Sequence, residues 1–136
     1  METISSLTTK NVVETLSAFH AALGDHKESI NRLNVYPVPD GDTGTNMFLT
    51  VASVLEELNG VDANDRSAVC TAISHGSLMG ARGNSGVILS QVLRGISNCF
   101  AQADEIDAKV LAVALSEASI AADGLVMKPV EVTILT

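Results

Sequence analysis

The sequence predicts an all-α protein whose helices run antiparallel, up and down, in one bundle. Along most of the chain, apolar residues recur at steps of three and four, the spacing that places them on one face of a helix. The sequence has no convincing run in which apolar and polar residues alternate, as they do in a half-buried strand. The segments between the helical patterns are short, which favours antiparallel packing of neighbouring helices.

The first two helices have clear apolar faces. The first face is formed by Val12, Leu16, Phe19 and Leu23. The second is formed by Met47, Val51, Val54, Leu55 and Leu58. Asn59 and Gly60 follow the second face at once, and because such residues favour helix ends, we expect this helix to stop there.

Three further helices each begin near a polar residue that can cap the first turn. Asp65 is the expected cap of the third helix, in which Val69, Ala72 and Ile73 face the core. The fourth is expected to begin at Asn84 or Ser85 and to carry on one side Ile88, Val92, Ile96 and Cys99. The fifth is capped by Asp107, reaches about residue 126, and turns inward Val110, Val113 and Ala114.

The composition is that of one acidic globular domain. A length of 136 residues suits a single domain, and a hydrophobic share of 46% is enough for a packed core. The formal net charge of −8 argues against nonspecific nucleic-acid binding, which needs clustered Lys and Arg. An acidic protein that handles phosphates usually needs a cation between itself and its ligand.

The cysteines and the apolar stretches indicate a cytoplasmic protein. Cys70 and Cys99 have no metal-binding spacing and lie among apolar residues, so we expect free buried thiols, as in a reducing compartment. The sequence shows no signal peptide, and its apolar stretches fall short of the roughly 20 residues that span a bilayer.

Two loops interrupt the helical patterns. The first is residues 34–46, NVYPVPDGDTGTN, and the second is residues 79–86, MGARGNSG. Each leads into the start of a helix, where unpaired N–H groups and a partial positive charge suit phosphate.

The first loop has the character of a magnesium site. Asp40 and Asp42 are two residues apart, and a turn at Gly41 can aim both carboxylates at one point. Two such oxygen ligands suit Mg²⁺, which takes its other ligands from water and substrate phosphates. Thr43, Thr45 and the N–H groups after them then meet those phosphates. The alternative is an ordinary turn in which the aspartates cap the helix.

The second loop lets a backbone approach a ligand closely, through Gly80, Gly83 and Gly86. It lacks the Gly-Lys-Ser/Thr ending of a Walker A loop. Asn84 and Ser85 can donate to phosphate or ribose, or they can simply cap the helix. Arg82 is a candidate for neutralising the charge of a transferred phosphate, with a solvated surface position as the alternative.

Two remaining polar residues carry weaker signals. His75 lies on a helix rich in Ala and Ser, and we expect it to be structural rather than a catalytic base. Thr133 opens the last segment and is a candidate nucleotide contact.

Three strings, NVYPVPDGDTGTNM, GSLMGARGNSGVILSQVLRG and VMKPVEVTILT, resemble the nucleotide-binding domain of bacterial fatty acid kinases. That domain is similar to the L domain of dihydroxyacetone kinases, the DhaL/DAK2-like type. The resemblance runs from about residue 8 to the end of the chain. It implies an all-α, DhaL-like barrel of antiparallel helices that binds ATP or ADP with Mg²⁺ at one end, and makes residues 1–136 a single partial domain of this type.

The resemblance also implies site residues. In the dihydroxyacetone kinase relatives, three aspartates hold two Mg²⁺ ions, and Asp40 and Asp42 match the last two. The first falls at or near Asn34, a neutral ligand. The nucleotide contacts implied by the matched motifs are Thr43, Gly44, Thr45, Asn46, Asn84 and Ser85.

The sequence departs from the family pattern near its end. The third motif usually reads Glu-Gly-Thr, and here Val132 replaces the glycine. The family domain continues for at least two more helices, so we expect a bundle incomplete at the C-terminus. Missing helices would leave apolar faces open to self-association or to a partner.

The resemblance implies transfer of the ATP γ-phosphate to the carboxylate of a fatty acid that a separate binding protein presents. A second hypothesis is a nucleotide-binding subunit whose acceptor is dihydroxyacetone. A third is a truncated, non-catalytic nucleotide-binding or interaction module. We expect little or no turnover by this chain alone.

Overall fold

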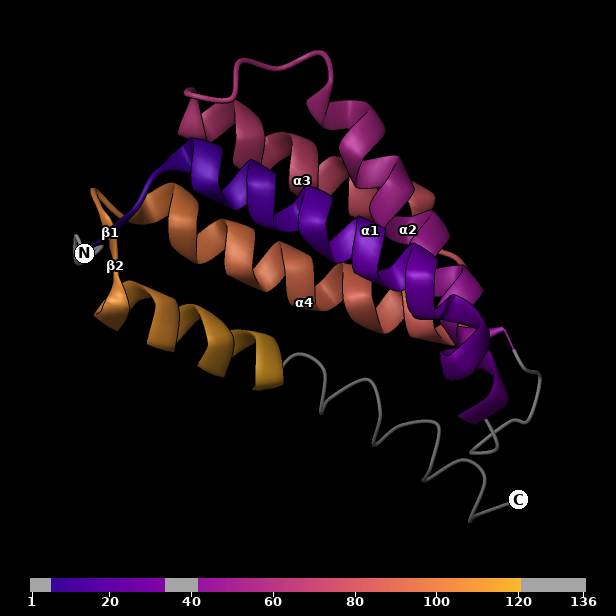
Figure 1. Ribbon diagram of the computed structural model, residues 1–136. Coiled ribbons are helices and arrows are strands. Elements are labelled where there is room, and N and C mark those ends of the chain that lie inside the picture. The colour runs from indigo at the N-terminus through magenta and orange to yellow at the C-terminus, as the bar shows by residue number, and fades with distance from the viewer. Residues whose placement is uncertain (1–5, 34–41, 121–136) are drawn as a thin grey trace, which may run out of the picture.

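The structure is a computed structural model that describes residues 6–33 and 42–120. The expected extension of the fifth helix to residue 126 therefore lies outside the described residues. Helix α1 (Thr9–Leu33) is followed by α2 (Thr43–Leu58), α3 (Arg66–Gly80) and α4 (Gly83–Gln102), and residues 108–120 are also helical. Successive helices reverse direction, as Figure 1 shows. The predicted all-α, up-and-down architecture is confirmed.

A short antiparallel sheet was not predicted. Strand β1 (Ser6–Leu7) pairs with β2 (Ile106–Asp107), so that Ser6 lies opposite Asp107 and Leu7 opposite Ile106. Two residues are too few to show the alternation that identifies a strand from sequence. The pair joins the segment before α1 to the segment after α4 (Figure 1).

The core fills the space between the helices with aliphatic side chains. Its main cluster comprises Leu16, Leu23, Val51, Val54, Leu58, Val69, Ala72, Ile73, Leu89 and Leu93. A second cluster joins α3, α4 and the helical segment 108–120, and comprises Cys70, Phe100, Ile106 and Ala114. All of the inward-facing residues predicted for the first three helices belong to the main cluster or pack against it.

Helix α4 differs from its prediction in both its start and its buried face. It begins at Gly83, after Arg82, rather than at Asn84 or Ser85. The most buried apolar residues are Leu89, Leu93 and Phe100, while the predicted face of Ile88, Val92, Ile96 and Cys99 is only partly buried. The reason is that α4 packs on two sides: against α2 and α3, and through Ile96 and Cys99 against the second cluster.

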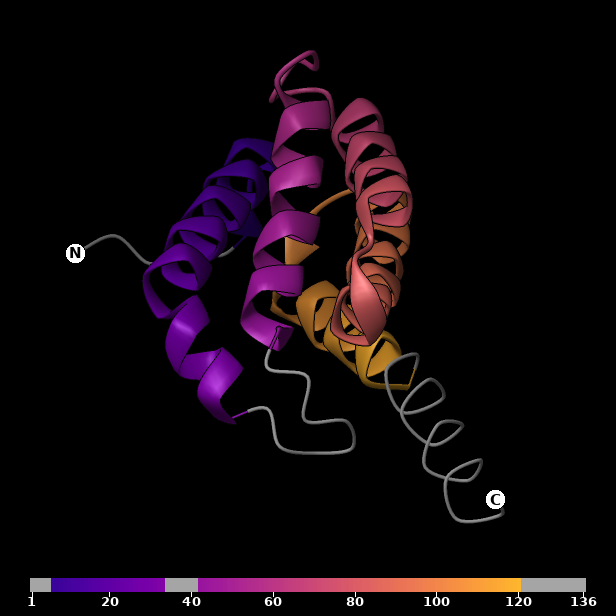
Figure 2. The ribbon, with the colours of Figure 1, turned by 90° about the vertical axis from the view of Figure 1, so that its right-hand side faces the viewer.

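The predicted caps hold at two helix starts. The Asp65 carboxylate accepts the Ala68 N–H at 3.2 Å, and the Asp107 carboxylate accepts the Val110 N–H at 2.9 Å. In segment 108–120, Ala114 is buried as predicted, but Val113 is 48% exposed, so that prediction was wrong. This segment lies at the edge of the described bundle (Figure 2), and it buries Ala114 and Ala118 while Val113 is exposed.

No helix within residues 6–33 and 42–120 is both long enough and apolar enough to cross a bilayer.

Candidate functional site

The starts of α2 and α4 lie at the same end of the bundle, beside the last turns of α1 (Figure 1). The Ser85 hydroxyl on α4 donates to the Thr43 carbonyl oxygen at the start of α2, at 3.4 Å. The two loops that the sequence singled out, far apart along the chain, therefore deliver their helix starts to one place. Predicted residues Thr43, Gly44, Thr45 and Asn46 form the first turn of α2, and Asn84 and Ser85 lie in that of α4.

Asp42 precedes α2 at the position of a helix cap, yet its side chain makes no cap hydrogen bond. The alternative of a simple aspartate cap is therefore wrong for this residue. Asp42 is partly buried, and the start of α2 does not use its carboxylate oxygens, the kind of ligand that a metal ion requires. Three other predicted site residues, Asn34, Asp40 and Thr133, lie outside the described residues, as does Val132.

The cap of α2 comes instead from Asn31 on α1. Its side-chain oxygen accepts the N–H groups of Gly44 at 2.8 Å and Thr45 at 3.2 Å, and its amide nitrogen donates to the Thr45 hydroxyl at 3.0 Å. Sequence reasoning missed Asn31 because the cap lies 13 residues away from Gly44. The local sequence around α2 carries no signal for it.

Close backbone contacts fix how the helices meet at this end. A Cβ added at Gly44 would lie 2.3 Å from the Lys27 carbonyl oxygen of α1. Gly83 has φ +64°, a left-handed angle that favours glycine, and a Cβ there would lie 2.4 Å from the Asn46 side-chain nitrogen. Gly44 is therefore needed for packing against the backbone of α1, and Gly83 for its backbone angle, apart from any contact they make with a ligand.

Thr50 links α2 to the loop before α4. Its side chain is fully buried, and its hydroxyl donates to the Asn46 carbonyl oxygen at 2.7 Å. The Thr50 hydroxyl oxygen in turn accepts the Arg82 N–H at 3.2 Å. A Cβ at Gly86 would lie 2.5 Å from this hydroxyl oxygen. Thr50 lies beyond the motif that directed attention to the first loop, so sequence reasoning missed it too.

The start of α4 has the character of an anion site. Within the described part of the chain, the N–H groups of Gly83, Asn84 and Ser85 have no hydrogen-bond acceptor. Arg82, the residue before them, is exposed and its side chain does not cap the helix. N–H groups at a helix start, with the positive end of the helix dipole behind them, bind phosphates and carboxylates.

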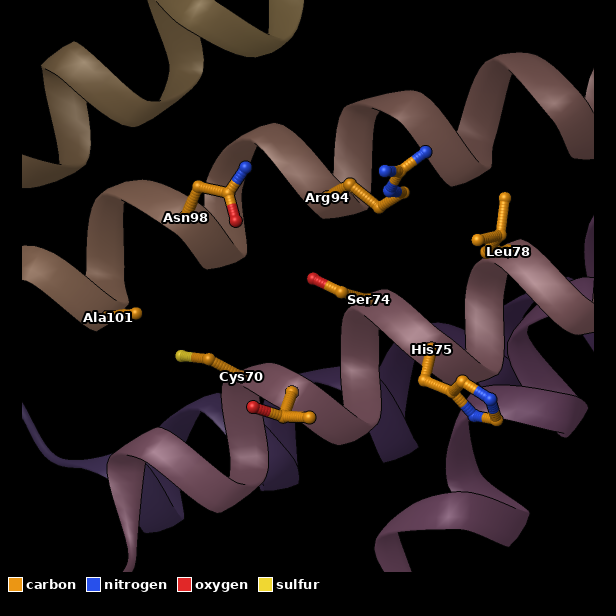
Figure 3. Close-up of a pocket in the computed structure, with 8 residues that line it drawn as sticks. Cys70, Ser74, His75, Leu78, Arg94, Asn98 and Ala101 are labelled. Carbon is orange, nitrogen blue, oxygen red and sulfur yellow. The ribbon is translucent and has the colours of Figure 1, made fainter.

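Other candidate residues lie along the sides of the bundle. His75 on α3 contacts Glu57 on α2, with 2.8 Å between Nδ1 and Oε1, and so links two helices as a structural residue would. A groove of about 350 Å³ between α3 and α4 is lined by Cys70, Thr71, Ser74, His75, Leu78, Arg94, Asn98 and Ala101 (Figure 3). None of the predicted nucleotide or metal ligands lines it.

The described residues contain no group of three or more His, Cys, Asp or Glu side chains placed to hold a metal ion. Both cysteines are free, as expected, and Cys70 is buried, whereas Cys99 is only partly buried. Burial raises the pKa of the Cys70 thiol above its usual value of 9.0, and the nearby Arg66 guanidinium offsets part of that effect.

The helices and the two adjacent helix starts define an all-α, up-and-down helical domain. The model of one family, described as the DAK2 domain, matches residues 37–136. The chain therefore belongs to the DAK2 domain family. DAK2 domains bind nucleotides.

Curated relatives support the same assignment. Protein YloV of Bacillus subtilis (strain 168) is 47% identical over 133 residues, which cover 98% of this chain and 24% of that protein. An uncharacterized protein of Staphylococcus aureus (strain USA300) is 48% identical over 114 residues, covering 84% of this chain and 21% of that protein. The chain thus spans about a quarter of the length of these relatives.

Proposed function

We propose that this chain binds ATP or ADP with Mg²⁺ at the end of the bundle where α2 and α4 begin, as the nucleotide-binding part of a kinase. The observation that carries the proposal is the hydrogen bond from Ser85 to the Thr43 carbonyl, which brings the two helix starts together. Membership of the DAK2 family adds a nucleotide as the natural anion.

The phosphates would be shared between the two helix starts. On α4, the N–H groups of residues 83–85 have no acceptor among the described residues and can donate to phosphate oxygens. On α2, Asn31 already accepts from Gly44 and Thr45, so this helix would contribute Thr43, Asn46 and the hydroxyl hydrogen of Thr45 instead.

Asp42 would hold Mg²⁺ together with Asp40, and Asn34 would complete the set for a second ion. The fit at Asp42 rests on its carboxylate, which the helix does not use as a cap. Bound magnesium would offset the repulsion between the phosphates and a protein of net charge −8. Arg82 would add positive charge near the transferred phosphate, and transfer itself requires positioning and charge neutralisation more than a general base.

Titration calorimetry of Mg–ADP and Mg–ATP tests this proposal. We expect binding in Mg²⁺ that is lost in EDTA, and at least about a tenfold loss of affinity in Asp42→Asn, since one metal ligand loses its charge. Asp104→Asn removes the same charge from an exposed position after α4 and serves as the matched control. Equal affinity in Mg²⁺ and in EDTA would rule out the metal bridge.

For the phosphate acceptor, we propose a fatty acid carboxylate presented by a separate binding protein. This rests on the Val-Pro-Asp-Gly-Asp-Thr-Gly spelling of residues 38–44. Phosphoryl-transfer assays with each acceptor and its partner protein would decide between a fatty acid and dihydroxyacetone. Nucleotide binding without transfer to either acceptor, when the other segments of a longer relative are supplied, would favour a non-catalytic module.

A further inference from the structure

We infer that the buried hydroxyl of Thr50 is the positioning element that couples the two helix starts, so that they form one binding site. The inference rests on the proposed function for its ligand, but the coupling itself is a property of the fold. Thr50 does not reach a ligand, because its side chain is fully buried. It acts through the backbone of the two loops.

The hydroxyl has two partners, one in each loop. It donates its hydrogen to the Asn46 carbonyl oxygen, at the end of the first turn of α2. Its oxygen accepts the Arg82 N–H, which precedes α4 and has no partner within that helix. The hydrogen bond is part-buried because the Thr50 end is enclosed, and it ties the backbone at Arg82 to α2, so Thr50 fixes where the chain turns into α4.

Two glycines show how closely the α4 start lies against this hydroxyl. Gly86 leaves room for the oxygen, since a Cβ there would approach it to 2.5 Å. Gly83 lies against the side chain of Asn46, and Asn46 precedes Thr50 by one turn of α2. The first turn of α4 is therefore built onto residues 46 and 50 of α2, and a shift of one helix start would move the other.

The chain offers matched variants for a test. Thr50→Val keeps the shape and removes both hydrogen bonds, while Thr50→Ser keeps the hydroxyl. Thr15→Val is the control, because the Thr15 hydroxyl also donates to a carbonyl four residues earlier, that of Asn11, but lies on the exposed side of α1.

The experiment measures Mg–ADP affinity by calorimetry and amide hydrogen exchange by mass spectrometry on the 136-residue chain. For Thr50→Val we expect affinity to fall roughly fivefold to tenfold, as the loss of one or two buried hydrogen bonds implies. Exchange should quicken in residues 43–46 and 82–86 together. Thr50→Ser and Thr15→Val should stay within about twofold of the wild type in both measurements.

Several outcomes would overturn the inference. One is a folded Thr50→Val that matches Thr15→Val in affinity and in exchange, and another is faster exchange in only one of the two segments. If the wild type does not bind Mg–ADP, the proposed function fails, while the exchange measurement still decides the coupling. If Thr50→Val does not fold, the exchange rate of the Arg82 amide in the wild type tests the inference. Exchange at the rate of an unstructured peptide would exclude the hydrogen bond from this amide to the Thr50 hydroxyl.

Discussion

At the scale of single residues, polar side chains from other helices hold the candidate site in place. Asn31 replaces the local cap that α2 lacks, and it satisfies two N–H groups that would otherwise be unpaired at the helix start. Asp42, at the cap position, is thereby spared for another role. Because Asn31 accepts these N–H groups, an acidic residue can precede the helix without capping it.

Asn31→Ala should destabilise the protein by about 1–2 kcal/mol, the usual cost of losing a helix cap. Asn31→Asp should retain most of that stability, because its carboxylate still accepts the Gly44 and Thr45 N–H groups and suits the helix dipole. Urea unfolding followed by circular dichroism measures both effects. Asn98→Ala, at an exposed position on α4, is the control, and equal stability of Asn31→Ala and this control would contradict the capping role.

Cys70 predicts a dependence of stability on alkaline pH. Burial raises the pKa of its thiol in the folded protein, so the folded state holds the proton more tightly than the unfolded state. This contribution to stability is fully present below the unfolded-state pKa, near 9.0, and is lost as the pH rises through the folded-state pKa. We therefore expect the wild type to lose more stability above that pH than Cys70→Ala does.

Denaturant midpoints measured from neutral to alkaline pH give the comparison for Cys70. Cys99→Ala removes the other free thiol and should leave the wild-type pH dependence in place. The same steep loss of stability in Cys70→Ala would show that another group causes it.

At the scale of helices, the sequence predicted what lies on one helix and missed what several helices build together. The caps at Asp65 and Asp107 are contacts three residues apart, so local sequence identifies them. The buried face of α4 depends on both neighbouring helices, and it differed from the local pattern. The links through Asn31 and Thr50 span 13 and 32 residues, beyond any local spacing rule.

Gly44 on α2 is a predicted nucleotide contact that also lies in a tight contact between helices. The sequence assigned it to the nucleotide, and the structure places it against the α1 backbone at Lys27. Gly44→Ala should cost about 1–3 kcal/mol, because a Cβ has no room unless the helices separate. Gly60→Ala, where nothing lies within 4 Å of the added Cβ, should change stability by less than about 0.5 kcal/mol.

The melting temperatures of these two glycine variants provide the measurement. A stable Gly44→Ala that still binds Mg–ADP would mean that α1 and α2 can separate at no cost to the site. A stable Gly44→Ala with weakened binding would assign the glycine to the ligand alone.

At the scale of the whole molecule, charge and helix direction work against each other at the candidate site. The protein carries a net charge of −8, which repels a nucleotide at long range. The helix starts of α2 and α4 present positive dipole ends at one place, and these act only over a short distance. In the proposed function, a divalent cation would reconcile the two, since it would reduce the charge of the ligand before the helix starts contact its phosphates.

Thermal stability should therefore rise with nucleotide and magnesium together, and with neither alone. A ligand at about one hundred times its Kd stabilises the folded state by about 2.7 kcal/mol. For a domain of this size, that corresponds to an increase of roughly 5–10 °C in Tm. Differential scanning fluorimetry with Mg–ADP, ADP in EDTA, and magnesium alone separates the contributions.

AMP with magnesium should give a much smaller shift in Tm, because it lacks the phosphates that bridge the cation to the helix starts. Asp42→Asn should remove the shift while leaving the Tm of the free protein nearly unchanged, because Asp42 does not cap α2. An equal increase in Tm with AMP and ADP would mean that the nucleotide binds through its base and sugar rather than through its phosphates.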